Sequence, residues 1–214
     1  MYTPRHFVDS DLDSLHRQID STRLSTLVTF DQTGLQASHV PLLLDPTQGP
    51  NGTLFGHLAS ANPQVKALMT GAQALVIFQG PDAYISPSFY ASKAEHGKVV
   101  PTWNYLAVHA YGPPETFTDS QWLLDIVSKL TDKHESSRPQ PWAVSDAPSD
   151  YIDKLLGAIV GFAIPIERLE GTRKLNQNRS AADVAGVSNG LGASDDPTDQ
   201  QIAHLMSPGE RRVR

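Results

Sequence analysis

Short strand-like segments separated by turn signals are the feature of this sequence that most constrains its fold. They follow one another between Leu24 and Tyr111, and short runs bounded by turn residues are typical of strands. Asp31-Gln32-Thr33-Gly34 is typical of a hairpin turn, and one short helix, capped by Asn62 with Pro63 in its first turn, interrupts the series. About six strands with one inserted helix predict a small closed barrel rather than a parallel sheet.

The apolar spacing and the turn residues place the predicted elements. Strands are expected over residues 24–30, 35–44, 53–58, 72–78, 83–86, 102–111 and 160–169. A Gly80-Pro81 turn separates two of them, and residues 87–100 are expected to form a polar loop. Helices are expected over residues 9–23, capped by Asp9 or Ser10, after a capping box that starts at Thr118, after Ser149, and weakly in two segments beyond Arg179. The fold class is therefore α+β and mainly β.

Composition excludes several kinds of chemistry. The chain has no cysteine, so disulfides, thiolate nucleophiles and Cys-ligated metals are excluded. No apolar run reaches the roughly 18 residues that a membrane-spanning helix needs, and the N-terminal residues lack the apolar core of a signal peptide. We therefore expect a cytoplasmic protein without a membrane partner.

Charge gives no support for binding to nucleic acid. The formal net charge is -6, whereas non-specific DNA affinity comes largely from Lys and Arg that neutralise phosphates. Local basic patches remain possible DNA contacts. The one dense cationic run, Arg211-Arg212-Val213-Arg214, is expected to be a solvated chain end.

The first candidate site is the junction between a strand and a helix over residues 56–63. Small polar residues lead into a helix N-terminus, where unpaired N–H groups and the helix dipole favour an anion. Ser60 and Asn62 add neutral donors that suit a phosphate. An ordinary capped helix start is the alternative interpretation.

The second candidate is the segment from Arg173 to Arg179, just after a predicted strand. Three cations alternate with three amides there, which indicates a phosphate clamp. A solvated turn is the alternative.

The third candidate is an aromatic strand. Alternation places Trp103, Tyr105, His109 and Tyr111 on one face, and Asn104, Leu106, Val108 and Ala110 on the other. An aromatic face with polar groups suits a planar heteroaromatic ligand, and equally well the packing of one subunit on another.

Other familiar catalytic or binding patterns are absent from the sequence. His39, in the middle of a predicted strand, is expected to be a hydrogen-bonded structural residue, since no triad accompanies it. None of the eight histidines forms an H-E-x-x-H motif or a comparable close pair, so a metal site is not expected. The nucleophile elbow, the Rossmann glycine motif and the Walker motif are missing as well.

A set of segments in a fixed order resembles the PaiB-type family of FMN-binding proteins, usually labelled FMN-binding negative transcriptional regulators. The likeness covers about residues 1 to 190 and rests on Met1-Tyr2-Thr3-Pro4, Ser38-His39-Val40-Pro41, Gly56-His57-Leu58-Ala59, Asn62-Pro63, Gly80-Pro81, Tyr84-Ile85-Ser86-Pro87-Ser88, Val100-Pro101-Thr102-Trp103-Asn104-Tyr105, His109, Gly112 and Lys174-Leu175-Asn176-Gln177-Asn178-Arg179. Phe89 departs from the pattern, because many members have Trp there.

The resemblance implies a six-stranded split β-barrel of the flavin reductase and pyridoxamine-phosphate oxidase type with flanking helices. It also implies a homodimer with FMN at the subunit interface, a barrel domain over residues 1–170, and a basic turn with a helical tail packed on the barrel over residues 171–214. Related oxidases have Arg and Lys in the phosphate-binding segment, whereas here no cation precedes Lys66; either Lys174 or Arg179 supplies the charge, or the affinity for FMN is low. The expected cofactor-binding residues are Ser38, His39, His57, Leu58, Ser60, Asn62, Trp103, Asn104, Lys174, Gln177 and Arg179.

Three functions are compatible with these residues and with the family resemblance. The resemblance implies an FMN-binding transcriptional regulator, with DNA as a partner by the family label alone. An FMN-dependent oxidoreductase is the alternative, because the flavin itself carries redox chemistry and residues 87–100 could act as a lid. A haem-binding split barrel is the third. Whether the protein is an enzyme stays open.

Overall fold

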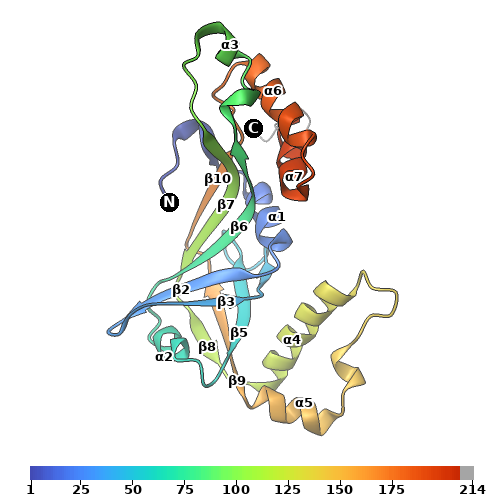
Figure 1. Ribbon diagram of the computed structural model, residues 1–214. Coiled ribbons are helices and arrows are strands. Elements are labelled where there is room, and N and C mark those ends of the chain that lie inside the picture. The colour runs from blue at the N-terminus through green and yellow to red at the C-terminus, as the bar shows by residue number, and fades with distance from the viewer. Residues whose placement is uncertain (208–214) are drawn as a thin grey trace. The chain divides into compact units, whose positions relative to one another are not determined.

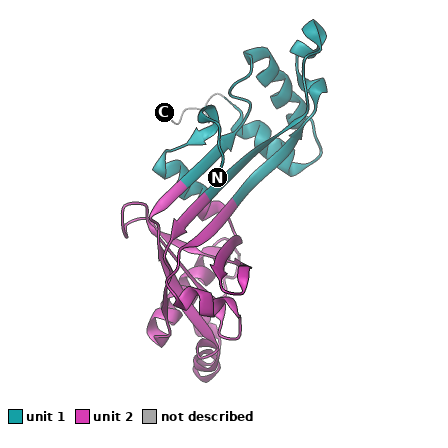
Figure 2. Cartoon of the chain, turned by 90° about the vertical axis from the view of Figure 1, so that its left-hand side faces the viewer, with its two compact units in different colours: residues 1–18, 79–108, 170–214 teal, residues 19–78, 109–169 magenta. Residues whose placement is uncertain are grey.

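The computed structural model describes residues 1–207, so the Arg211–Arg214 run lies outside the described residues. Within these, the chain forms two compact units (Figure 2). Unit 1 comprises residues 1–18, 79–108 and the chain from 170 onward, and unit 2 comprises residues 19–78 and 109–169. The domain boundary expected near residue 170 stays a prediction.

The described residues form two sheets built from antiparallel strand pairs (Figure 1). The six-stranded sheet has the order β1-β10-β7-β6-β2-β3, and the four-stranded sheet has the order β4-β5-β9-β8. The strands are β1 (Val8–Asp9), β2 (Ser25–Asp31), β3 (Gly34–Val40), β4 (Leu43–Asp45), β5 (Thr53–Ala59), β6 (Ala74–Ile85), β7 (Thr102–Gly112), β8 (Glu115–Phe117), β9 (Ile159–Pro165) and β10 (Arg168–Lys174).

The predicted helices form, although their caps differ in part from those expected. Asp11, rather than Asp9 or Ser10, accepts the Ser14 N–H in the first turn of α1, and Asp119 rather than Thr118 caps α4 by accepting the Trp122 N–H. Beyond Arg179 the two expected helices are confirmed as α6 and α7. The α-helices are α1 (Leu12–Ser21), α2 (Gln64–Met69), α3 (Ser92–His96), α4 (Ser120–Glu135), α5 (Ser149–Leu156), α6 (Ala181–Gly192) and α7 (Pro197–Leu205), and short 3₁₀ turns are η1 (Arg5–Phe7), η2 (Pro87–Phe89) and η3 (Val144–Asp146).

The hairpin prediction is confirmed, and three strand predictions need correction. Asp31 pairs with Gly34 across Gln32 and Thr33, and Gly34 takes a positive φ of 107°, which glycine adopts at little cost. The strand expected over 35–44 is two strands, β3 and β4, and the one expected over 160–169 divides between β9 and β10. Conversely, the two strands expected on either side of Gly80-Pro81 are one strand, β6.

Pro81 fits inside β6 because of how this strand is paired. The register of β6 with β2 runs from Leu75 to Ile77 and does not reach Pro81. A proline lacks the N–H that a ladder needs, so it is tolerated where one edge of a strand is unpaired. Sequence alone does not reveal which stretch of a strand has a neighbour on both sides.

Each unit has its own apolar core. In unit 2 the fully buried side chains include Leu27, Leu54, Phe78, Phe162 and Ile164. In unit 1, α6 and α7 pack on β6 and β7 through a cluster that includes Ile85, Leu106, Val187, Leu191 and Ile202.

Residues 87–100, expected to be an irregular loop, contain η2 and α3, and a buried carboxylate holds this segment to α6. Asp183 is 4% exposed and accepts the backbone N–H of Ser92 at 2.9 Å and its hydroxyl at 3.0 Å. These hydrogen bonds, the backbone one first, hold the pKa of the Asp183 carboxyl below its usual value. The ionised form therefore stabilises the folded chain.

We expect Asp183→Asn to lower thermal stability at neutral pH, with hydrogen exchange at the Ser92 amide becoming faster. A lowered folded-state pKa gives stability that is present above the unfolded value and is lost as pH falls through the folded value. The difference in melting temperature between the wild type and Asp183→Asn should therefore vanish only below about pH 3.9, the usual value of an aspartate. Asp13→Asn, at an exposed position of α1, is the control. A difference that already disappears near neutral pH would contradict the role of the ionised carboxylate.

Candidate functional site

The junction between β5 and α2 in unit 2 is built around Asn62. Its Oδ1 accepts the backbone N–H of Gln64 at 2.9 Å, which confirms Asn62 as the cap of α2, and its Nδ2 donates to the Ser38 hydroxyl at 3.0 Å. Gln64 is 1% exposed and its Nε2 donates to the Leu27 carbonyl and to the Thr29 hydroxyl, both at 3.1 Å. These contacts fix the start of α2 on the β2–β3 hairpin.

The expectation of several unpaired N–H groups at this junction is wrong. The backbone N–H of Ser60 donates to Ala158 O at 2.9 Å, and that of Asn62 to Ala59 O at 2.8 Å. The N–H groups of Gln64, Val65 and Lys66 are also used within the chain. An anion at this junction would therefore contact side chains and few backbone groups.

The predicted residues of unit 2 divide into accessible and enclosed ones. Ser60 and His39 are exposed, Ser38 is half-buried, and the His39 ring lies 3.2 Å from the Thr26 hydroxyl through its Nδ1. Leu58 is buried in the core. The Nδ1 of His57 is buried without a hydrogen-bond partner within residues 1–207, and burial lowers the pKa of this imidazole.

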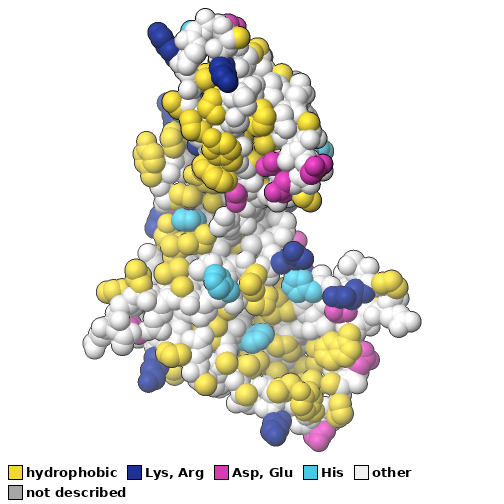
Figure 3. Space-filling view, viewed as in Figure 1, with side chains coloured by type: hydrophobic (Ala, Val, Ile, Leu, Met, Phe, Trp, Pro, Cys, Tyr) yellow, Lys and Arg dark blue, Asp and Glu magenta, His cyan; other side chains and the backbone are white. Residues whose placement is uncertain are grey.

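The aromatic residues of β7 in unit 1 take the sides that alternation predicted. Trp103 is 53% exposed and meets the half-exposed Tyr84 ring edge-on, with 5.8 Å between the ring centres. Asn104 on the other side is fully buried, and its Nδ2 donates to the Met206 sulfur at 3.5 Å. Figure 3 shows apolar side chains gathered over the strands of this unit. The Trp103 side chain is therefore available to a ligand, whereas Asn104 lies on the opposite, buried face of β7.

Lys174, at the end of β10 in unit 1, is a half-buried cation without a matching carboxylate. Its ammonium donates to the Thr102 hydroxyl at 2.7 Å and lies 5.8 Å and 6.0 Å from the ring centres of Phe7 and Tyr105. Across residues 1–207, no carboxylate lies within 4.0 Å of this ammonium. Burial lowers the Lys174 pKa, and a bound anion would relieve that desolvation.

The remaining predicted residues shape the turn after β10. Gln177 Oε1 accepts the Leu175 N–H at 2.7 Å, and its Nε2 donates to the Arg173 carbonyl. Asn176 takes a positive φ of 60°, and the Arg179 guanidinium lies over the Tyr90 ring at 5.1 Å. The amides of this segment therefore stabilise the turn, and Lys174 is its best-placed cation for an anion.

Sequence reasoning missed three residues that organise these surfaces. Gln64 fixes the junction, Thr102 positions the Lys174 ammonium, and Tyr84 supports Trp103. Thr102 and Tyr84 stand in segments that the resemblance already contains, so their neighbours in sequence offered a signal. For Gln64 the signal would have been a polar residue at a buried position of a short helix.

The residues present fit FMN in its two chemical parts. A phosphate needs hydroxyl, amide and cationic donors; unit 2 by itself offers the exposed Ser60 hydroxyl, and unit 1 by itself offers the Lys174 ammonium. An isoalloxazine ring needs flat apolar area beside polar groups, which Trp103 and Tyr84 supply. Each unit therefore offers groups that suit part of a flavin mononucleotide.

The fold defines the class of protein first: a split β-barrel, mainly β, with flanking helices. The chain is similar to the solved structure of the FAD and heme binding protein from Mycobacterium smegmatis, with 16% identity, 83% of this chain and 78% of that one covered, and a TM-score of 0.60. It is also similar to the flavocytochrome Anf3 from Azotobacter vinelandii, with 14% identity, 86% and 78% coverage, and a TM-score of 0.60. At such low identity these likenesses establish the fold alone.

The family follows from sequence. The chain belongs to the family described as "Putative FMN-binding domain", which matches residues 1–168. It is 32% identical over 206 residues, 96% of each chain, to the protease synthase and sporulation protein PAI 2 of Bacillus subtilis. It is 40% identical over 198 residues, 73% of this chain and 76% of the relative, to an uncharacterized protein of Aspergillus fumigatus. The PaiB-type resemblance is thus confirmed, and flavin is the cofactor of the family.

No helix among residues 1–207 combines the length and the hydropathy that a bilayer span needs.

Proposed function

We propose that this protein is an FMN-binding regulator of the PaiB type, in which Lys174 supplies the positive charge that holds the flavin phosphate. The observation that carries the proposal is the desolvated Lys174 ammonium, which has a hydroxyl and two aromatic rings around it and no carboxylate within 4.0 Å among residues 1–207. An uncompensated cation of this kind costs free energy unless an anion joins it. When bound, FMN supplies redox chemistry of its own.

Within each unit, the other predicted residues would also contribute to flavin binding. In unit 2, Ser38, His39, Ser60 and Asn62 would offer hydroxyl, imidazole and amide groups at the junction, with His57 and Leu58 supporting it from within. In unit 1, Trp103 would contact the ring, Asn104 would anchor the opposite face of β7 through Met206, and Gln177 and Arg179 would hold the turn that carries Lys174. These roles can be tested one unit at a time.

The binding experiment compares FMN with riboflavin, which lacks the phosphate. The purified protein is saturated with each flavin in turn, washed, and its visible spectrum recorded. We expect FMN bands to remain and riboflavin bands to be lost, because charge-assisted hydrogen bonds are roughly twice as strong as neutral ones. Equal retention would contradict phosphate recognition, and a Soret band in the freshly purified protein would favour haem as the ligand instead.

A homodimer is part of the proposal, because the exposed aromatic face of β7 suits a subunit interface as well as a ligand. Light scattering should give a mass near twice 23.3 kDa. A monomer would remove the interface at which the family resemblance places the flavin.

DNA binding needs its own experiment, since the acidic charge of -6 offers no general affinity for phosphates. A gel-shift titration at physiological salt against promoter fragments, with and without FMN, tests it. Retardation above that of a scrambled fragment supports direct regulation, whereas equal retardation of both contradicts it.

A further inference from the structure

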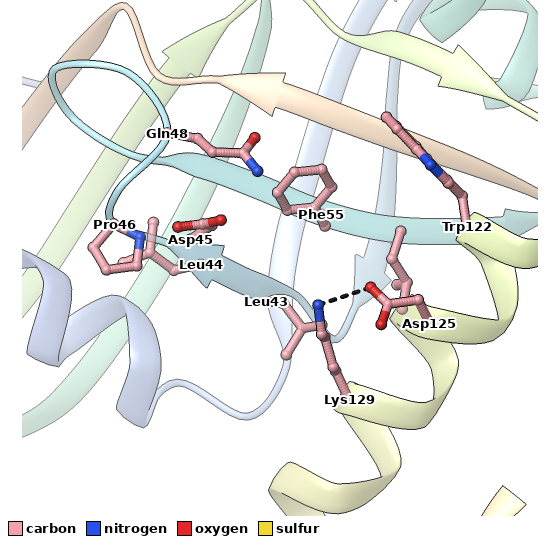
Figure 4. Close-up of a pocket in the computed structure, with 10 residues that line it drawn as sticks. Leu43, Leu44, Asp45, Pro46, Gln48, Phe55, Trp122, Asp125 and Lys129 are labelled. Atoms are coloured by element: carbon pink, nitrogen blue, oxygen red, sulfur yellow. Dashed lines mark ion pairs between the residues drawn. The ribbon is translucent and has the colours of Figure 1, made fainter.

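Unit 2 contains a pocket of about 490 Å³ between α4 and the strands β4 and β5. None of the residues expected to bind FMN lines it. The lining residues are Leu43, Leu44, Asp45, Pro46, Gln48, Phe55, Trp122, Asp125, Ile126 and Lys129 (Figure 4).

The pocket has aromatic walls that the fold holds in place. Trp122 is 58% exposed, and its ring meets Phe117 edge-on, with 5.2 Å between the ring centres. Phe117 in turn covers Gly161, where a Cβ atom would lie 2.2 Å from the Phe117 ring. Phe55 forms the floor beside Trp122, as Figure 4 shows. Flat apolar area that remains accessible and rigid is typical of a ligand site.

The charged groups of the pocket sum to a net negative charge. Asp45 and Asp125 are acidic and Lys129 is basic, which gives a formal charge of -1 among the lining residues. Lys129 pairs with Asp125 at 2.8 Å, as the dashed line in Figure 4 marks. The hydroxyl and the N–H of Thr47 both donate to Asp45 Oδ1, at 2.7 Å and 2.9 Å, and hold the pKa of Asp45 below its usual value. Asp45 is therefore ionised at neutral pH.

The positions of these groups indicate what a ligand must look like. In Figure 4, Phe55 lies between Asp45 on one side and Trp122 on the other. His57 follows Phe55 by two residues on the same face of β5, and because burial lowers its pKa, it adds no positive charge to this face near neutral pH. An aromatic body would cover Phe55 and Trp122, and a cationic end would reach Asp45.

We propose that this pocket is a second small-molecule site, which binds an aromatic monocation with its ring system on Phe55 and Trp122 and its ammonium group at Asp45. Aromatic faces attract cations as well as apolar rings, so both parts of such a molecule are recognised. The site is separate from the residues proposed for FMN.

The test uses three ligands that share one ring system. These are 2-(1-naphthyl)ethylamine, which is cationic at neutral pH, 2-(1-naphthyl)ethanol, which is neutral, and 1-naphthylacetate, which is anionic. Isothermal titration calorimetry with the full chain, at low salt and with FMN present at saturation, should give affinities in the order amine, alcohol, acetate. Tightest binding of the acetate, binding of none of the three at millimolar concentration, or displacement of the amine by FMN would overturn the proposal.

Single substitutions in the pocket test which side chain contacts which part of the ligand. Asp45→Asn keeps the oxygen that accepts the Thr47 N–H but removes the charge. It should therefore raise the Kd of the amine about three- to fivefold and leave the Kd of the alcohol unchanged. Lys129→Gln removes a competing cation and should lower the Kd of the amine by a similar factor. Trp122→Ala should raise the Kd of all three ligands. Asp132→Asn, an exposed carboxylate of α4 outside the pocket, should change nothing. Equal losses of amine and alcohol in Asp45→Asn, with an unchanged circular dichroism spectrum, would exclude Asp45 as the cation partner.

Discussion

Gly112→Ala is expected to lower the free energy of unfolding by about 1–3 kcal/mol, the usual cost of overpacking a tight contact. A Cβ atom at Gly112 would lie 2.0 Å from the backbone oxygen of Pro165 and 3.0 Å from Ile164 Cγ2. Backbone cannot swing aside as a flexible side chain does, and the neighbouring Glu167 N–H donates to Tyr111 O at 2.9 Å. The end of β7 must therefore separate from the β9–β10 connection to admit a methyl group. Urea unfolding with an unchanged m-value is the measurement.

Gly157→Ala is the matched control in the same unit. The nearest atoms to a Cβ there are 3.6 Å and 3.7 Å away, and Gly157 has a helical φ of -65°. An alanine fits there without strain, so the midpoint of urea unfolding should stay the same or rise slightly. If both variants unfold at the wild-type midpoint, the close approach of Gly112 to Pro165 is not a constraint on the fold.

Lys174→Ala is expected to raise the Kd of FMN about 10- to 100-fold, because hydrogen bonds to charged groups contribute about 1.5–3 kcal/mol. Riboflavin has no phosphate, so its Kd should rise less than about threefold in this variant. Fluorescence titration of both flavins gives the two ratios. The Thr102 hydroxyl and the Phe7 and Tyr105 rings around the ammonium remain in the variant, so ring binding should be preserved.

Two further variants make the Lys174 test specific. Lys174→Arg keeps the positive charge and should recover most of the FMN affinity, whereas Lys98→Ala, at an exposed position of unit 1, should leave both flavins unaffected. Equal losses of FMN and riboflavin in Lys174→Ala would mean that this side chain supports the fold and does not hold the phosphate.

Predictions of local structure are confirmed where the residues that decide the structure lie close together in the chain. Asp31-Gln32-Thr33-Gly34 forms its hairpin because Gly34 takes a positive φ and the flanking strands alternate. Asn62 caps α2 through the N–H two residues away. Trp103 and Asn104 face opposite sides of β7 because successive residues of a strand always do. Such patterns predict a small closed barrel, whereas the split-barrel class and the flavin family rest on the resemblance of several motifs in a fixed order.

Strand boundaries were harder to predict, because pairing partners decide them. Pro81 looked like a turn residue, yet it continues β6 past the stretch that is paired with β2. Pro41 and Leu42 interrupt what looked like one strand, and β4 then pairs with β5 in the other sheet. Neither outcome follows from the residues of the segment itself.

The sequence by itself determined the hairpin at residues 31–34, the cap at Asn62, the alternation of β7 and the family, since each depends on residues a few positions apart or on motifs in a fixed order. The tertiary structure alone decided which polar groups are already paired and which are not. In the folded chain the N–H groups of the α2 junction already donate to other groups of the chain. Asn62 donates to Ser38 across 24 positions, and Lys174 donates to Thr102 across 72 positions without a carboxylate nearby. The physical reason is that desolvation and charge compensation depend on every atom within a few ångströms, and in a folded chain most of those atoms come from distant segments.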